Sequence, residues 1–101
     1  MKTQESIKTD LSKLEKSLII FLRPSFLYIT NPDEDNDIQI LVATRQFNQK
    51  SVQERIIIVF GIIKQNCPQI LEDRLIIVQA YSPPEMDDIL EYVFNNEEET
   101  I

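Results

Sequence analysis

The sequence predicts one α+β domain in which a three-stranded sheet packs against helices, with the elements in the order αββαβα. The chain has 101 residues, of which 43% are hydrophobic and 27% are charged, as is usual for one folded domain. Segments with helical periodicity alternate with short runs rich in β-branched residues. Two capping-box patterns mark where the later helices begin.

The first element is predicted to be an amphipathic helix. Its apolar residues recur at helical spacing at Ile7, Leu11, Leu14 and Leu18. We expect the helix to end near Ser17 or Leu18. Pro24 then prevents any continuation, and the residue before it is biased away from helix.

Two strands are expected next, at Phe26–Thr30 and Ile38–Thr44, because both segments are rich in aromatic and β-branched residues. The polar, turn-rich segment Asn31–Asp37 joins them. Two strands linked in this way most simply form an antiparallel hairpin.

The central helix is predicted from the capping box Ser51-Val52-Gln53-Glu54, which opens the run from Arg55 to Asn66. The run contains Ile-Ile-Ile-Val-Phe, which favours a strand by propensity. Its length and the cap favour a helix. Because it is apolar nearly all round, we expect burial on more than one side.

A third strand, Leu75–Tyr81, is followed at once by a second capping box, with Ser82 as the N-cap, Pro83 at the first helical position and Glu85 at the third. We expect this helix to run to about Phe94. Its inward positions are predicted to be Met86, Ile89, Leu90 and Val93. Residues 1–94 then form the domain, and residues 95–101 form an acidic, frayed tail.

The charge balance narrows the classes of partner. Acidic residues outnumber basic ones 17 to 10, for a formal charge of −7. This disfavours nucleic acid and anionic membranes as main partners. The longest apolar stretches, Leu18–Leu22 and Ile56–Ile63, are far shorter than the roughly 20 residues of a membrane span.

The chain has one cysteine and no histidine. A single cysteine forms no internal disulfide, which suggests a reducing compartment. The N-terminus also lacks the apolar core of a signal peptide, so we expect a cytoplasmic protein. Without histidine, the commonest metal ligand and the usual general base at neutral pH are missing, so we expect no enzyme, cofactor or metal site.

Several motifs favour simple structural roles. The acidic run Asp33–Asp37 resembles the start of a calcium loop, but Ile38 stands where that loop needs Gly and Thr44 where it needs Glu. Cys67 has no histidine to activate it, although Lys64 lies one turn away and would lower its pKa slightly. The carboxylate pairs Glu72/Asp73 and Asp87/Asp88 have no evident catalytic partner.

Arg45, Lys50 and Arg55 form a basic cluster between the second strand and the central helix. They lie near the free backbone donors at that helix start, an arrangement that suits contact with an anion or nucleic acid. The alternative, which we favour, is that they are counter-charges on an acidic protein.

From Leu22 to about Glu85 the sequence resembles the BolA family. The segment Phe47–Arg55 is similar to that family's F-x-G-K-S-x-x-x-R entry into its main helix, and Leu75–Glu85 to its last strand and Y-T-P-x-E ending. Leu22–Leu27 resembles the approach to its first strand. The resemblance implies a three-stranded mixed sheet akin to the class II KH arrangement, and a glutaredoxin-like protein partner.

The family's metal ligands have no counterpart here. Its histidine after the conserved arginine, which helps to hold an iron–sulfur cluster shared with a monothiol glutaredoxin, corresponds to Ile56. The family's His- or Cys-bearing loop corresponds to the acidic turn Asp33–Asp37, and Gln49 replaces its glycine. The resemblance therefore implies a scaffold without iron–sulfur ligation.

Three functional hypotheses follow. The first is a non-enzymatic protein-interaction or regulatory module, with a homodimer as one form of it, since an unsatisfied apolar helix marks an interface. The second is nucleic-acid binding through the KH-like fold, and the third is a small catalyst that uses carboxylates or Cys67. The possible interaction surface comprises Arg45, Lys50, Ser51, Arg55 and Tyr81.

Overall fold

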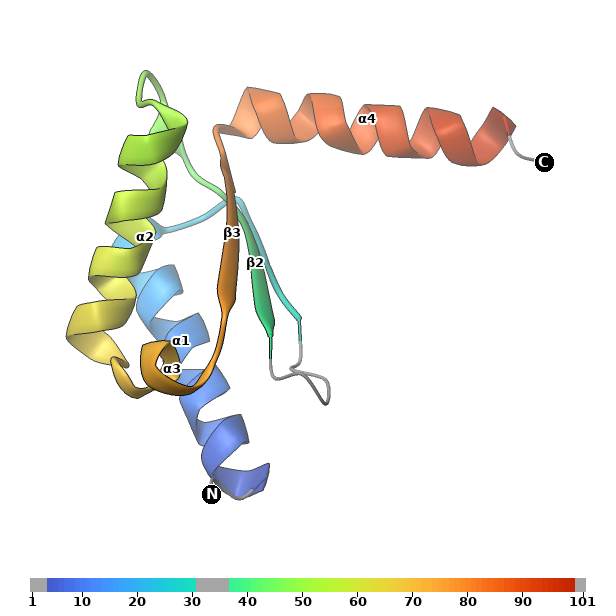
Figure 1. Cartoon of the computed structure of the whole chain (residues 1–101). Helices are drawn as coiled ribbons and strands as arrows, with labels where there is room; N and C mark the ends of the chain where they lie inside the picture. The colour runs from blue at the N-terminus through green and yellow to red at the C-terminus, as the bar shows by residue number, and fades with distance from the viewer. Residues whose placement is uncertain (1–3, 31–36, 100–101) are drawn as a thin grey trace.

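A computed structural model describes residues 4–30 and 37–99 of the chain (Figure 1). The main elements and two short helical segments follow one another as α1 (Gln4–Leu22), β1 (Phe26–Ile29), β2 (Ile38–Ala43), η1 (Arg45–Phe47), α2 (Val52–Asn66), α3 (Gln69–Asp73), β3 (Ile76–Tyr81) and α4 (Pro83–Glu99). The predicted α+β class is confirmed. The predicted acidic turn Asp33–Asp37 lies outside the described residues except for Asp37.

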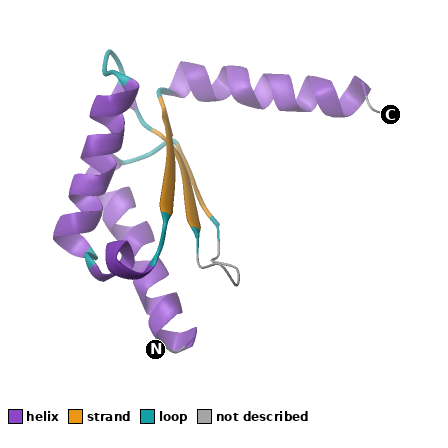
Figure 2. Ribbon diagram, viewed as in Figure 1, coloured by secondary structure: helices purple, strands orange, loops and turns teal. Residues whose placement is uncertain are grey.

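The three strands form one mixed sheet in the order β1-β2-β3. β1 and β2 pair antiparallel, with Ile29 opposite Ile40, as the predicted hairpin requires. β2 and β3 pair parallel, with Ile38 opposite Ile76. The connection between these parallel strands runs through α2 and α3, which lie on the same side of the sheet as α1 (Figure 2).

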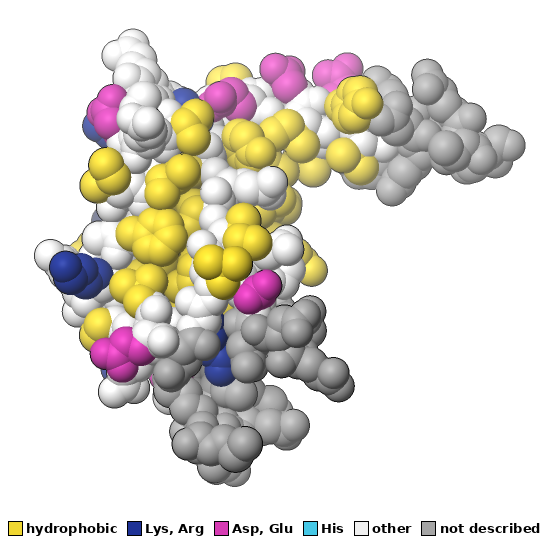
Figure 3. Space-filling view, in the orientation of Figure 1, with side chains coloured by type: hydrophobic (Ala, Val, Ile, Leu, Met, Phe, Trp, Pro, Cys, Tyr) yellow, Lys and Arg dark blue, Asp and Glu magenta, His cyan; other side chains and the backbone are white. Residues whose placement is uncertain are grey.

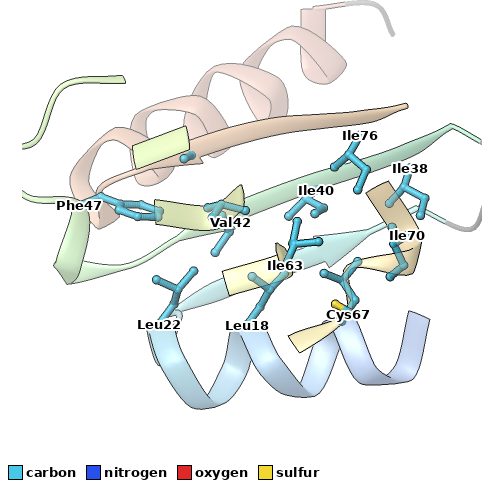
Figure 4. Close-up of a cluster of buried hydrophobic side chains, with 13 residues drawn as sticks. Leu18, Leu22, Ile38, Ile40, Val42, Phe47, Ile63, Cys67, Ile70 and Ile76 are labelled. Carbon is cyan, nitrogen blue, oxygen red and sulfur yellow. The ribbon is translucent and has the colours of Figure 1, made fainter. Parts of the chain in front are cut away.

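The hydrophobic core fills the space between the sheet and the helices α1 and α2. In Figure 4, Leu18 and Leu22 of α1 point toward the strands, and Ile63 of α2 lies between them and Ile40. These side chains are at most 1% exposed. Burying an aliphatic side chain of this size stabilises the fold by roughly 1.5–3 kcal/mol relative to leaving it exposed.

Helix α1 is longer than expected. It ends at Leu22, so the predicted end near Ser17 or Leu18 is wrong. The reason is that Leu22 continues the four-residue spacing of Leu14 and Leu18, and all three side chains are buried. Arg23 ends the helix with a left-handed backbone (φ 45°) while its N–H donates to Ile19 O at 3.0 Å.

Helix α2 begins with the predicted capping box. Glu54 N donates to Ser51 Oγ at 3.1 Å, and Ser51 N donates to Glu54 Oε1 at 3.3 Å. Val59 and Ile63 are buried, whereas Ile57 remains 70% exposed. On either side of the buried pair, Ile58, Phe60 and Ile62 also pack against the core, so burial extends over more than one side of α2 but does not include Ile57.

Other differences concern short or terminal segments. The short helix α3, between α2 and β3, and the turn η1, after β2, were not predicted from the sequence. Single helical turns carry too little periodicity to be recognised in sequence. Helix α4 continues to Glu99, so the predicted end near Phe94 is wrong. The acidic residues beyond Phe94 are good helix formers, which explains the extension.

The molecule has an extended arm. α1, α2, α3 and the sheet form the body, and α4 leaves it at the end of β3 and projects away from the side of the sheet that carries α1 and α2 (Figure 1). The radius of gyration is 14.8 Å, against about 13 Å for a compact domain of this length.

Candidate interaction site

Arg55 joins the segments that meet where α4 begins. It lies in the early part of α2, and its side chain is 9% exposed. Nε donates to Lys50 O at 3.0 Å, and Nη1 donates to Ala80 O at 3.2 Å and to Glu85 Oε1 at 2.7 Å. The guanidinium thus ties the loop before α2 to the end of β3 and the start of α4. A buried charge needs such a full set of partners.

Glu85 completes this junction from the α4 side. Its Oε1 accepts from Ser82 N at 2.8 Å and from Ser82 Oγ at 2.7 Å, as well as from Arg55. The backbone N–H of Ser82, then its hydroxyl and Arg55, lower the pKa of Glu85 to about 2. The carboxylate is therefore charged at neutral pH, although its side chain is 48% exposed.

The cap of α4 differs in detail from the predicted capping box. The Glu85 side chain accepts from the Ser82 backbone, as expected. However, the Ser82 hydroxyl donates to the same carboxylate, whereas a reciprocal box uses that hydroxyl to accept from the amide of Glu85. Arg55 explains the change, because its positive charge holds Glu85 Oε1 beside the start of the helix. This junction, Arg55 with Ser82 and Glu85, fixes where α4 leaves the body.

Beyond the junction, the apolar side chains of α4 become progressively exposed. Met86 is 3% exposed, whereas Val93 is 44% and Tyr92 is 67% exposed. Val93 was expected to face inward, and this prediction is wrong because the body does not extend beneath the outer part of α4. Figure 3 shows hydrophobic side chains along the edge of α4 that faces back toward the body.

The open face of the sheet lies on the side to which α4 projects (Figure 2). Side chains alternate across a strand, so the residues between the buried core positions belong to this face. Tyr28 and Ile77 are 57% and 41% exposed there, and Leu41 and Tyr81 are half-buried. The open face and the outer part of α4 together present an apolar surface without a partner within the described chain.

The structure brings part of the predicted interaction surface together. Arg55 contacts Lys50 through the lysine's backbone carbonyl, and Ser51 is the N-cap between them. Tyr81 ends β3 next to Ala80, which Arg55 also contacts. Arg45 is exposed in η1 and makes no hydrogen bond to this group within the described chain. The Arg55–Glu85 pair was not predicted from the sequence. Arg55 ends the first motif that resembles the BolA family, Phe47–Arg55, and Glu85 ends the second, Leu75–Glu85.

Cys67 lies in the core at the C-terminal cap of α2 and is 5% exposed. Burial raises the pKa of its thiol, while the positive charge of Lys13 lowers it in part. The predicted influence of Lys64 is thus replaced by that of Lys13. A buried thiol of raised pKa is a poor nucleophile, in agreement with the structural role favoured for it.

The described residues hold neither a metal-binding cluster nor a membrane-spanning helix. Within residues 4–30 and 37–99, no group of three His, Cys, Asp or Glu side chains is placed to hold a metal ion. In the same part of the chain, no helix combines the length and apolar character needed to cross a bilayer.

Solved structures show which fold this is. BolA1 from Arabidopsis thaliana superposes with a TM-score of 0.63 at 15% identity, over 75% of this chain and 94% of that chain. The chain has the BolA fold. A Bol-like protein from Babesia bovis gives a TM-score of 0.63 at 21% identity, over 76% of this chain and 88% of its own. The BolA domain of SufE1 from Arabidopsis thaliana gives 0.59 at 15% identity, over 73% and 92%.

No protein-family model and no curated protein sequence matches the chain. The superposed structures alone confirm the predicted likeness to BolA proteins, and they confirm it for the fold. Gln49 adds a local observation, because its φ of 64° is left-handed, a conformation that favours glycine. The glycine of the resembled motif thus suits this backbone, whereas Gln49 fits it with strain. Ile56, where the sequence resemblance leads us to expect the family's histidine, is a half-buried apolar residue in α2.

Proposed function

We propose that this protein is a non-enzymatic protein-interaction or regulatory module on a BolA-like scaffold, and that α4 is its binding element. The observation that carries the proposal is the projection of α4 from the body with Tyr92 and Val93 exposed. A helix of this kind suits insertion of its apolar side into a groove of another protein.

The charge of α4 indicates the chemistry of the partner. Asp87, Asp88 and Glu91 are exposed on the helix, and the sequence contains no lysine or arginine from Pro83 to Ile101. An acidic border around apolar side chains is complementary to an apolar patch bordered by lysine or arginine. The partner is therefore a protein with such a patch, in a reducing compartment such as the cytoplasm.

The chemistry of the junction supports a binding role over catalysis. The charged groups of Arg55 and Glu85 are engaged with each other and with backbone atoms. Cys67 is buried in the core. The half-buried side chain of Ile56 offers no metal ligand, so binding to a glutaredoxin-like partner would use protein contacts without a shared iron–sulfur cluster.

Nucleic-acid binding is less well supported. Of the three basic residues in the predicted cluster, Arg55 is buried and its guanidinium is paired with Glu85. Only Arg45 and Lys50 remain, on a protein of net charge −7. Phosphate binding needs a larger set of available cations.

The test is affinity capture from the native cell extract with variants of the purified protein. Val93→Asp and Tyr92→Asp place a charge on the exposed apolar side of α4, and Ile20→Asp places the same charge on α1, where Ile20 is 67% exposed. We expect a protein that the wild type and Ile20→Asp capture but the α4 variants lose. The purified partner is then titrated in rising salt, which should weaken binding.

Two results would contradict the proposal. One is a captured partner whose binding is insensitive to both α4 variants. The other is loss of binding in Ile20→Asp alone, which would move the interface to the helical side of the molecule.

A further inference from the structure

The edge strand β3 carries backbone groups that point away from the sheet. β3 pairs with β2 on one side only, since the strand order is β1-β2-β3. The carbonyls of Leu75 and Tyr81 accept from Ile38 N and Thr44 N, so these residues turn their backbone groups toward β2. Because the direction alternates along a strand, the alternate residues Ile76, Val78 and Ala80 turn theirs to the free edge.

One end of this edge is already occupied. Ala80 O accepts the hydrogen bond from Arg55 Nη1, which confirms that its carbonyl points outward. For Ile76 and Val78, no hydrogen bond of the outward backbone groups is found among the described residues. The free part of the edge is therefore centred on Ile77, between these two residues.

This edge lacks the features that usually protect an edge strand. Charged residues and proline normally prevent such strands from pairing with other chains. The stretch from Leu75 to Tyr81 contains neither. Leu75 is 61% and Ile77 is 41% exposed. Figure 3 shows hydrophobic side chains in the middle of the face formed by α2 and β3, with charged side chains around its margin.

We infer that β3 pairs antiparallel with β3 of a second copy of this chain, so that two sheets join into one. A twofold axis at Ile77 places Ile76 of each copy opposite Val78 of the other. These are the residues with outward groups, so each such pair exchanges both of its backbone hydrogen bonds. On the open face of the sheet, Ile77 lies against its own counterpart, and Leu75 lies opposite Gln79.

The charge distribution favours a second copy as the occupant. Two chains of net charge −7 repel each other, and they associate best where each presents no charge. The β3 edge meets this condition, whereas the acidic α4 does not. A twofold interface also needs a self-complementary surface, which the free groups of Ile76 and Val78 provide about Ile77.

This dimer is independent of the proposed binding role of α4, because it uses another part of the molecule. Loss of the dimer with α4-dependent capture intact would refute this inference alone. Loss of capture with the dimer intact would refute only the proposed function.

The experiment is sedimentation velocity of the purified full-length chain over a dilution series from about 1 mM to 1 µM. We expect the wild type to shift from twice the monomer mass toward the monomer on dilution. Ile77→Lys places two like charges opposite each other at the axis and should raise the dissociation constant at least about tenfold.

Gln39→Lys is the matched control. Gln39 is the β2 neighbour of Ile77 in the register and lies on the same open face, one strand away from the edge. It should leave the dissociation constant within about twofold of the wild type. Circular dichroism confirms that both variants are folded.

Amide hydrogen exchange of the wild type provides a measurement without substitution. The N–H groups of Ile76 and Val78 should exchange more slowly at high than at low protein concentration. A wild type that is monomeric throughout the series would overturn the inference. So would a dimer that Ile77→Lys leaves unchanged, or one whose Ile76 and Val78 amides show no protection with concentration.

Discussion

The Oε1 atom of Glu85 accepts hydrogen bonds from Ser82 N, Ser82 Oγ and Arg55, and this set of donors makes folding sensitive to acid. The pKa of Glu85 falls from its ordinary 4.5 to about 2 in the folded state. In the unfolded chain the carboxylate takes up a proton near pH 4.5. The stabilisation is thus complete above that pH and is lost as pH falls toward 2.

We therefore expect Glu85→Gln to lower the free energy of unfolding at pH 7, and the difference from the wild type to shrink between pH 4.5 and 2. Urea unfolding at several pH values measures it. Glu91→Gln, on the exposed side of the same helix, is the control. An equal difference at pH 7 and pH 2.5 would show that the carboxylate charge of Glu85 does not contribute.

Gln49 provides a second prediction at the scale of one residue. Its left-handed backbone (φ 64°) is unfavourable for a residue with a Cβ atom. Gln49→Gly should therefore stabilise the protein, by about 0.5–1 kcal/mol after the entropy of glycine in the unfolded chain is allowed for. Thermal unfolding tests this. Gln53→Gly, inside α2, should destabilise by a similar amount, and stabilisation by both would point to another cause.

At the scale of elements, Gly61 is a glycine that we expect a larger residue to improve on, whereas Gln49 is a larger residue that we expect glycine to improve on. It lies inside α2, is exposed, and a Cβ atom at this position would meet nothing within 4 Å. Gly61→Ala should therefore stabilise the protein by about 0.5–1 kcal/mol, because alanine loses less backbone entropy in a helix. Urea unfolding measures this, with Gln65→Gly in the same helix as the reverse substitution. If Gly61→Ala destabilised the protein, another group would have to contact this surface of α2 in solution.

The main elements could be predicted from the sequence where local signals agree. The Ser51 capping box marked the start of α2 despite its strand-like composition, and the two antiparallel strands followed from their turn-rich link. Helix α1 extends beyond the predicted end near Ser17 or Leu18 because Leu22 continues the apolar spacing of Leu18, and Pro24 still permits helix as far as Leu22. The position where a helix ends depends on how its last turn packs against other elements. This packing cannot be predicted from the local sequence.

The candidate site was only partly predictable. The sequence predicts that Arg55, Lys50 and Ser51 share one surface. In the structure Arg55 is buried and pairs with Glu85, thirty positions away. Such a contact exists only once β3 has brought the start of α4 beside α2. Exposure of Val93 has the same origin, because helical periodicity shows which side is apolar and not whether another element covers it.

At the scale of the whole molecule, the arm formed by α4 is expected to be less stable than the body. Val93 and Tyr92 are exposed, whereas Val59 and Ile63 of α2 are completely buried. Helical segments with few buried apolar contacts open locally at low free energy. We expect the amides of residues 89–93 to exchange hydrogen much faster than those of residues 59–63.

Nuclear magnetic resonance of the free protein measures these rates residue by residue. Addition of the partner captured through α4 should then slow the exchange of residues 89–93. Equal protection of both segments in the free protein would mean that α4 folds back onto the body in solution.

The parallel pairing of β2 with β3 also has a consequence for the order of folding. The strands β1 and β2 are neighbours in sequence, but Ile38 meets Ile76 only after the whole of α2 and α3 has been placed between them. Closing the longer loop costs more chain entropy, so this contact is expected late on the folding pathway. Val78→Ala should then mainly accelerate unfolding, and Ile29→Val should slow refolding, as stopped-flow kinetics would show. A newly synthesised chain would thus add the edge strand β3 to the sheet last. The Arg55 junction, from which α4 projects, would form at the same step.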